Sequence, residues 1–259
     1  MKKVCIIIRA YNRLEYTIQA ISHIIRNTEY PNYEILVVNN GSQDGTEQWL
    51  NWVSQNSPFY SEKVRYAHLP QNKGDWGGLV HGATLTDAEY VMQVDNDILV
   101  PYFVENINGS KKPDISSSYL ISLNKWLGIL VELIEKTNYR VVMCKRLGIK
   151  TRLDALSEPI AMRMKVLNGY EVDVCVYDVS RPVACFITRR TELIEFAKKF
   201  PDITGTQTKF EFAKFVNKKV GKTDFITCSQ MEGYTGREND NYIQKNKYPQ
   251  DNKNCWEFI

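Results

Sequence analysis

Four short apolar runs, each followed by polar residues and then by a helical pattern, constrain the fold of the first hundred residues. Residues 4–8 form a continuous, largely β-branched run, which is typical of a parallel strand covered on both faces. Apolar residues then recur with helical spacing at positions 14, 18, 21, 24 and 25. Similar runs begin near residues 33, 64 and 90. This alternation predicts right-handed βαβ units in a mostly parallel central sheet flanked by helices, the α/β class.

Polar residues gather where each predicted strand ends, at positions 9–13, 39–44, 72–78 and 95–97. The carboxyl ends of parallel strands meet at one edge of a sheet, and ligands of such sheets bind at that edge. We therefore expect these four clusters to lie together and to form a binding site.

The stretch from Tyr90 to Pro101 is the most informative of the four, because its apolar strand ends at two carboxylates, Asp95 and Asp97. Carboxylates are unfavourable beside a buried strand unless something pairs them. The usual partner for this spacing is a hard divalent cation, held by oxygen and shared with substrate phosphates. A polar surface turn is the alternative when the motif stands alone.

Composition limits the classes of protein to consider. The 259 residues are 43% hydrophobic and 24% charged, as expected for one α/β domain or a domain with an insertion. A net charge of +3 favours anionic ligands but is no nucleic-acid signature. The amino-terminal apolar run stops at Arg9, as in a strand rather than a signal peptide, and no run approaches the roughly 18 apolar residues of a membrane helix.

Cysteines and histidines narrow the cofactor choices. The six cysteines form no CxxC pair and lie mostly in apolar runs, so we expect buried, reduced thiols and a cytoplasmic location. Three histidines are too few for a His-rich metal site.

The second half of the chain is less regular. Residues 105–118 are a polar linker, 145–164 are basic and irregular, and the residues beyond 233 form a polar tail or lid. Helices are expected over 120–136, 191–199 and 210–220, and strands over 139–144, 172–176, 183–188 and 224–228.

Four motifs in order, IIIRAYNR, YEILVVNNGSQDGT, NKGDWGG and VMQVDNDILVP, together resemble a family 2 glycosyltransferase of the GT-A fold. The resemblance covers about residues 3–102 and continues weakly to about 230. It implies a nucleotide-sugar donor, a divalent cation (Mn²⁺ or Mg²⁺), and inversion at the anomeric carbon in one displacement. It also implies one domain over 1–259, with a donor-binding half (1–102), an acceptor-binding half (103–233) and the tail (234–259).

The resemblance assigns the nucleotide base to the first two clusters. Ala10, Tyr11 and Arg13 stand where the family packs and hydrogen-bonds the base. Asn39 and Asn40 replace an acidic pair, and the amide oxygen of Asn40 can still accept the imide N–H. Uracil, thymine and guanine all stay open. Asp44 and Thr46 are interpreted as turn and helix-cap residues.

The third and fourth clusters are assigned to the rest of the donor. Asn72 and Gly74 match the loop near the donor, where glycine lets the backbone approach a phosphate. Leu79 and Val80 stand where the family often has arginine and asparagine, so Asp75 and Trp76 are candidates to contact the sugar instead. His81 is interpreted as a helix-face residue.

The resemblance places Asp95 and Asn96 on the ribose side. Asp97 is the expected metal ligand, with Asp95 beside it, and Glu232 is a candidate further ligand where the family often has histidine.

A general base near the acceptor hydroxyl is also required. The family's Glu-Asp pair is not intact here, and Glu211 is the nearest candidate, with Asp202 as its rival. A solvated glutamate on a helix face is the alternative interpretation of Glu211.

The acceptor stays open between a glycan, a lipid-linked sugar, a protein and, less favoured, a nucleic acid. No integral membrane segment is expected, although the basic residues of 145–165 could contact anionic lipid. Two alternative functions are a nucleotidyltransferase and a catalytically silent nucleotide- or glycan-binding module. The first would need a glycine-rich basic loop after the first strand, and residues 9–13 contain no glycine.

Overall fold

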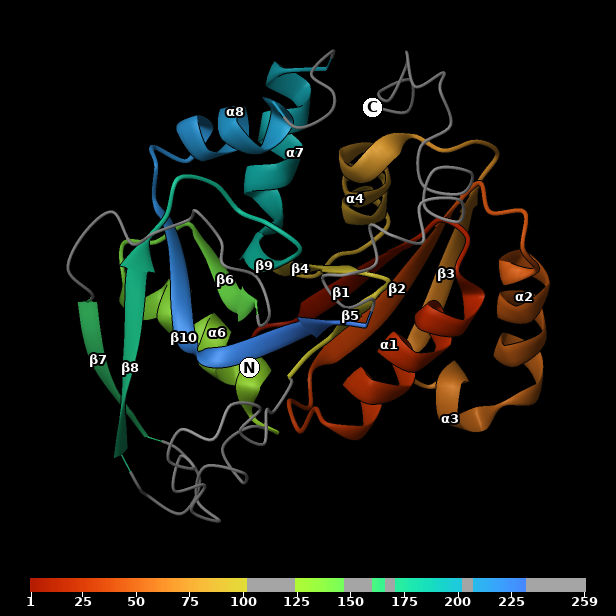
Figure 1. The fold of residues 1–259 in the computed structure, drawn as a ribbon, viewed down its shortest axis with the longest axis horizontal. Helices are drawn as coiled ribbons and strands as arrows, with labels where there is room; N and C mark the ends of the chain where they lie inside the picture. Colours follow the sequence, from red (N-terminus) through yellow and green to blue (C-terminus); the bar gives the residue numbers. More distant parts are fainter. Residues whose placement is uncertain (102–123, 147–159, 166–170, 202–206, 232–259) are drawn as a thin grey trace.

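The computed structural model describes residues 1–101, 124–146, 160–165, 171–201 and 207–231, which form one ten-stranded sheet with helices on both faces (Figure 1). The strand order is β3-β2-β1-β4-β9-β6-β10-β8-β7, and β5 pairs with β10 outside this path. The first four strands in chain order form a parallel unit with bounds Val4–Ala10 (β1), Tyr33–Asn40 (β2), Val64–Leu69 (β3) and Tyr90–Asp95 (β4). The α/β class and the helix-flanked sheet are as predicted.

Antiparallel pairing takes over beyond β4. β9 runs antiparallel to both β4 and β6, and β8 runs antiparallel to β10 and β7, while β6 and β10 are parallel. The bounds of this second unit are Ile98–Leu99 (β5), Val141–Arg146 (β6), Ile160–Lys165 (β7), Glu171–Asp178 (β8), Cys185–Arg189 (β9) and Val220–Gln230 (β10). The parallel part of the sheet thus coincides with the segment that carries the four motifs.

Two layers of helices cover the sheet. One face packs against Leu14–Arg26 (α1), Thr46–Asn56 (α2), Pro58–Ser61 (α3) and Trp126–Lys136 (α6). Gly74–Thr84 (α4), Arg190–Lys199 (α7) and Gln207–Phe215 (α8) cover the other face and group together in Figure 1. Among the described residues, no helix combines the length and apolar character that crossing a bilayer requires.

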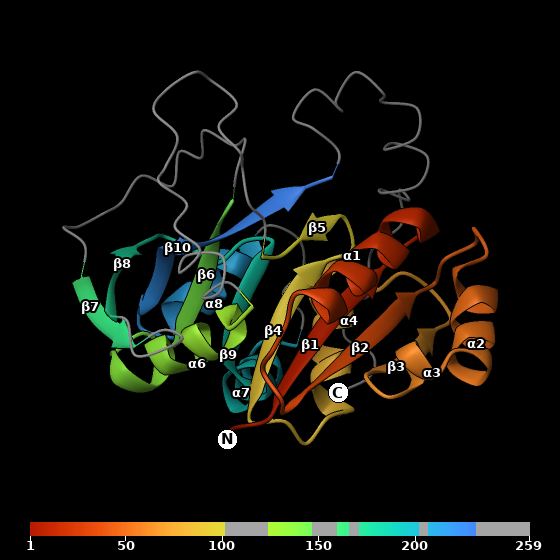
Figure 2. The same cartoon turned by 90° about the horizontal axis from the view of Figure 1, so that it is seen from below.

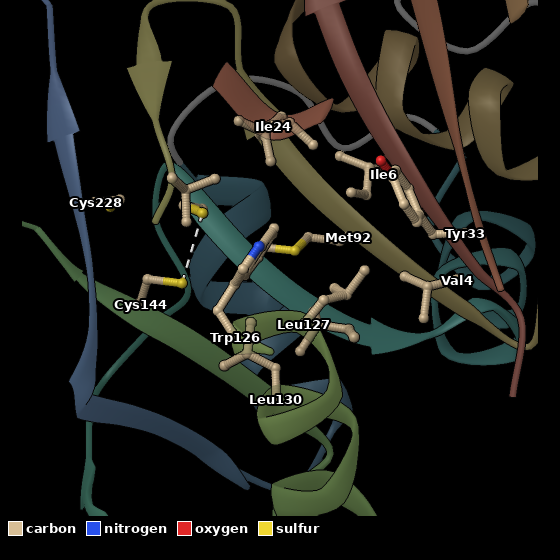
Figure 3. Packing of buried hydrophobic residues seen from close by; sticks show 14 of the residues in the cluster. Val4, Ile6, Ile24, Tyr33, Met92, Trp126, Leu127, Leu130, Cys144 and Cys228 are labelled. Carbon is tan, nitrogen blue, oxygen red and sulfur yellow. Dashed lines mark hydrogen bonds between the residues drawn. The ribbon is translucent and has the colours of Figure 1, made fainter. Parts of the chain in front are cut away.

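The core is continuous across both units of the sheet. Trp126 and Leu127 of α6 pack beside Met92 of β4, and Cys144 lies at the β6 end of the same cluster (Figure 3). The Sγ atom of Cys144 lies 3.7 Å from the Sγ atom of Cys185. The four cysteines whose side chains are described are buried and free, which agrees with the expectation of buried thiols.

Local structure differs from the sequence expectation at two places. Ile160–Lys165 forms an edge strand inside a segment expected to be irregular, because its partner β8 supplies the hydrogen bonds that the residues alone do not indicate. The helix expected to reach residue 220 ends at Phe215, since Asn217 and Lys218 adopt positive φ values of 55° and 58° and turn the chain into β10. The linker predicted over 105–118 and the tail beyond 233 both lie entirely outside the described residues.

Helix α4 lies close against the parallel strands. A Cβ atom at Gly82 would stand 2.9 Å from two side-chain atoms of Ile7 and 3.1 Å from one of Val38, all within the core. A glycine here therefore lets α4 approach β1 and β2, which fixes where the start of this helix meets the ends of those strands.

We predict that Gly82→Ala lowers the free energy of unfolding by about 1–3 kcal/mol, because overpacking the core outweighs the better helix propensity of alanine. Urea unfolding of the two proteins measures the difference. Gly128→Ala in α6 is the matched control, since its Cβ would stand 3.4 Å from the Tyr30 ring, an ordinary contact. Equal stability of the two variants would contradict the close packing of α4.

Candidate functional site

The register of the parallel strands brings the polar clusters together at one edge of the sheet. Ala10 stands opposite Asn39, which stands opposite His68, and Arg9 stands opposite Asp95 on the next strand. Residues paired across neighbouring strands carry their side chains on the same face of the sheet, so the two members of each pair lie side by side. The predicted gathering of the four clusters is therefore present in the fold.

Arg9 and Asp95 form an ion pair across β1 and β4. The Arg9 side chain is 6% exposed, that of Asp95 33%. The second guanidinium nitrogen of Arg9 lies 3.2 Å from the carboxylate of Asp75, whose side chain is 69% exposed. Burial raises the pKa of Asp95, Arg9 opposes this shift, and the nearby carboxylates of Asp75 and Asp97 add to it. The site therefore concentrates like charges that need cations beside them.

Arg13 forms a second, deeper ion pair with Asp97. Its Nη1 donates to Oδ2 of Asp97 at 2.9 Å, and both side chains are almost fully buried. Arg13 precedes the first residue of α1 in a left-handed conformation with φ 63°, as does Asn12 with φ 54°. This tight turn after β1 is what directs the Arg13 guanidinium back toward the end of β4.

Asn12 joins three loops of the site. Its backbone N–H donates to Ser42 Oγ at 2.9 Å, and its Oδ1 accepts from the backbone N–H of Gln43 at 2.8 Å. Its carbonyl accepts from Nδ2 of Asn96 at 3.1 Å, and the same Asn96 amide reaches Thr17 Oγ1. Asn96, predicted on the ribose side, is thus buried and oriented by the start of α1.

Asn40 is buried and orders the loop before α4. Its Nδ2 donates to Asn72 Oδ1 at 2.8 Å and to the Gly74 carbonyl at 3.1 Å, and its Oδ1 accepts from the Lys73 N–H at 2.8 Å. Asn72 in turn accepts from the Gly74 N–H. Asn40, Asn72 and Gly74, predicted to contact the donor, are brought together as predicted, and Asn40 is a scaffold of the loop as well as a candidate for the base.

Asn39 and its neighbours complete the end of β2. Oδ1 of Asn39 accepts from the Ser42 N–H, which directs its Nδ2 to His68 Nδ1 at 3.0 Å. The adjoining Gly41, with φ +79°, passes within van der Waals contact of the backbone at Gln71, where an added Cβ would stand only 2.8 Å away. Glycine is required there because the β2 and β3 loops touch through their backbones.

The turn role predicted for Asp44 and Thr46 is confirmed. Asp44 accepts from the N–H and hydroxyl of Thr46 at the start of α2, and also from the N–H of Leu14 at the start of α1. One carboxylate therefore satisfies orphan donors of two helices. Tyr11, expected to stack on a base, is half-buried, and Ala10, which precedes it, is buried.

Trp76 requires a correction. The sequence suggested a contact between Trp76 and a sugar, but the structure places this side chain in the core against Phe186, Phe196 and Phe212, with ring centroids 5.1–6.3 Å apart. The physical reason is the helical period: the position after Asp75 on α4 turns inward toward α7 and α8. Of the two sugar-contact candidates, Asp75 alone is exposed.

Helix α8 presents a lysine, rather than the glutamate, to the carboxylate cluster. Nζ of Lys209 lies 3.7 Å from Oδ2 of Asp75. Glu211, two residues further on and so on roughly the opposite face of the helix, pairs instead with Lys214 at 2.6 Å. Its rival Asp202 lies outside the described residues.

The end of β10 returns to the Asp95–Asp97 turn. β5 follows this turn and lies beside the end of β10, with which it pairs (Figure 2). The Met231 N–H donates to the Asp97 carbonyl at 2.8 Å. The chain thus reaches Asp97 at the residue before Glu232, while Glu232 itself lies outside the described part of the structure.

The oxygen ligands at this edge of the sheet are of the kind that a hard divalent cation prefers. Asp95 and Asp97 already pair with Arg9 and Arg13, however. Mg²⁺ and Mn²⁺ are held in many sites by one or two carboxylates together with substrate phosphates. Asp95 and Asp97 are such a pair, and Asp95 is partly open to solvent. Within the described ranges, no group of three or more histidine, cysteine or acidic side chains could hold a metal alone. A cation here would need oxygen ligands from a bound substrate.

Sequence reasoning missed Lys209 as a member of the site, and it gave no individual role to Arg9 or Asn12, although both lie in the predicted 9–13 cluster. The signal for Arg9 was present, because a charged residue that ends an apolar parallel strand must face the charged end of a neighbouring strand. Lys209 had no such signal, since it depends on how α8 packs against α4.

Comparison with known proteins agrees with the fold and the motifs. Residues 5–105 match the family described as Glycosyl transferase family 2. An uncharacterized glycosyltransferase of Rickettsia bellii is 28% identical over 97 residues, which are 38% of this chain and 13% of that protein. The poly-beta-1,6-N-acetyl-D-glucosamine synthase of Staphylococcus epidermidis is 28% identical over 111 residues, 41% of this chain and 26% of that protein. The chain therefore spans a minor part of these relatives' length.

Solved structures extend the likeness beyond the motifs. The mannosyltransferase PcManGT of Pyrobaculum calidifontis, in complex with GDP-Man and Mn²⁺, superposes with a TM-score of 0.61 at 13% identity, covering 94% of this chain and 61% of that one. TarS 1–349 of S. aureus with UDP-GlcNAc gives 0.56 at 15% identity, covering 89% and 59%. The four-motif resemblance is confirmed over residues 5–105, which match Glycosyl transferase family 2, and the fold of the described residues is that of the GT-A glycosyltransferases.

Proposed function

We propose that this enzyme transfers a sugar from a nucleoside-diphosphate sugar to an acceptor hydroxyl, with inversion at the anomeric carbon. The observation that carries the proposal is the placement of Asp95 and Asp97 at the carboxyl edge of the parallel sheet, beside the loops expected to hold a nucleotide. Binding of UDP-GlcNAc and GDP-Man by structural neighbours supports the donor class. UDP-, dTDP- and GDP-linked donors all remain candidates.

Each group of site residues is proposed to bind a different part of the donor. Tyr11, Arg13 and the Asn39–Asn40 pair face the base, Asp95 and Asn96 orient the ribose, and Asp97 with Asp95 would hold Mn²⁺ or Mg²⁺. When bound, such an ion would act as a Lewis acid that stabilises negative charge on the departing diphosphate. The protein's own part is to fix the anomeric carbon so that the acceptor oxygen approaches from the opposite face.

The base that deprotonates the acceptor is proposed to come from α8 or the loop before it, as Glu211 or Asp202. The second half of the single proposed domain, residues 103–233, would shape the acceptor site. Glycans, lipid-linked sugars and other hydroxyl acceptors fit this scheme, and peripheral contact with a membrane is compatible with it. We propose a cytoplasmic location, where nucleotide sugars are made.

A catalytically silent nucleotide- or glycan-binding module is the second candidate. The observation that favours it is the pairing of Glu211 with Lys214 rather than with the carboxylate cluster. Metal-dependent nucleotide binding without sugar turnover would distinguish the module from the enzyme. The third candidate, a nucleotidyltransferase, would release pyrophosphate rather than a nucleoside diphosphate.

We predict that Asp97→Ala reduces metal-dependent release of nucleoside diphosphate by a factor of about 100 or more, because the proposed ligand of the cation that would stabilise charge on the leaving diphosphate is lost. Release is measured over UDP-, dTDP- and GDP-sugars, with Mn²⁺ and with EDTA. Asp87→Asn is the matched control, since this exposed carboxylate pairs with Lys3 at the opposite edge of the sheet. Full activity of a folded Asp97→Ala protein would contradict the proposed role.

A comparison of Glu211→Gln with Asp202→Asn identifies the general base that deprotonates the acceptor hydroxyl. We expect the variant that lacks the true base to lose transfer to the acceptor by a factor of about 100 or more while its donor affinity is unchanged. Lys214→Gln tests whether the pairing of Glu211 matters. Normal transfer by both Glu211→Gln and Asp202→Asn would show that neither residue is the general base.

A further inference from the structure

The start of α4 carries a carboxylate between two cations. Asp75, in the first turn of the helix, lies 3.2 Å from Arg9 and 3.7 Å from Lys209. The three side chains come from α4, β1 and α8, three elements distant in the chain. The amino end of a helix also attracts negative charge through its unpaired N–H groups. Two cations and a helix terminus therefore converge on one anion-binding position.

Asp75 is a weakly held occupant of this position. Its side chain is 69% exposed, and exposed ion pairs contribute roughly 0–1 kcal/mol because solvent screens them. Arg9 is held differently, since its side chain is buried and its other nitrogen is anchored by Asp95. An incoming anion with more charge than one carboxylate could therefore replace Asp75 at Arg9 without disturbing the Arg9–Asp95 pair.

Stability alone is a poor explanation for Arg9. Its Nε is buried without a hydrogen-bond partner, which is unfavourable in the interior. Apolar residues of similar size often stabilise a protein as well as a buried ion pair does. Gly78 on α4 lies beside Arg9, where a Cβ would stand 3.4 Å from the arginine Cγ. A small residue on α4 therefore leaves room for the arginine stem beneath the start of the helix.

We propose that Arg9 and Lys209 bind the diphosphate of the donor, and that Asp75 is the anion they hold until the diphosphate displaces it. This inference rests on the proposed function and names the groups that recognise its substrate. Arg9 then supplies, from the end of β1, the cation that Leu79 and Val80 cannot supply from α4. Asp75 becomes a competitor of the donor rather than a ligand of its sugar.

The test compares calorimetric binding of UDP, GDP and dTDP with binding of the matching nucleosides, with Mn²⁺ and with EDTA. Asp75→Asn should tighten binding of the diphosphate that the wild type recognises by about two- to fivefold, because a competing anion is removed. Affinity for the nucleoside should not change. The exposed position makes this variant safe for folding, and Asp87→Asn is its control.

Loss of the cations should have the opposite effect. Arg9→Gln should weaken diphosphate binding about tenfold or more, and Arg9→Lys less, with nucleoside affinity retained. Lys209→Gln should weaken diphosphate binding less than Arg9→Gln, because Lys209 is more exposed. Arg65→Gln is the arginine control, since Arg65 also pairs with a carboxylate but lies away from the cluster.

Two outcomes would overturn the inference, and they are distinguishable. If the wild type binds the diphosphate and Asp75→Asn leaves its affinity unchanged or weaker, the displacement fails while the proposed function stands. If the wild type binds no nucleotide under any condition, both fail. A gain in affinity from Asp75→Asn that is smaller in the Arg9→Gln background would show that the two residues are coupled, as the proposal requires.

Discussion

Two arginine–aspartate pairs hold together the edge of the sheet that carries the candidate site. Arg9 stands opposite Asp95 in the register of β1 and β4, and Arg13 reaches Asp97 from the turn that follows β1. Without them, carboxylates two residues apart would repel each other at the end of a buried strand. The pairs also fix the ends of the two strands. The surrounding loops, which are expected to bind the nucleotide, are therefore held in defined positions. Structure and proposed chemistry thus depend on the same four charges.

The parallel half could be predicted from the sequence because its signals are local. Four apolar runs, each ending in a polar turn and separated by three helical patterns, occur up to residue 97, and each predicted element is present. The same logic located the edge where Asp95, Asp97, Asn40 and Gly74 meet, since parallel strands carry their carboxyl ends to one side. Asp44 was recognised as a turn residue because short acidic side chains satisfy helix N–H groups.

The remainder depends on contacts that no local pattern encodes. Trp76 was expected at the sugar because Leu79 and Val80 stand where the family often has arginine and asparagine, yet the packing of α7 and α8 makes Trp76 a core residue. The β7 edge strand exists through pairing with β8, and Lys209 joins the site through the approach of α8 to α4. The sequence also offered Glu211 as a base without revealing that Lys209 occupies the helix face toward the carboxylates.

The edge around Asp95 and Asp97 is proposed to be a nucleoside-diphosphate site. A crystal structure with the nucleoside diphosphate that binds best, grown with Mn²⁺ and recorded with its anomalous signal, would test this. We expect the diphosphate between the Asp95–Asp97 turn and the start of α4, within hydrogen-bond distance of Arg9, with manganese at Asp97. A nucleotide bound elsewhere, or an Arg9–Asp75 contact unchanged beside a bound diphosphate, would contradict it.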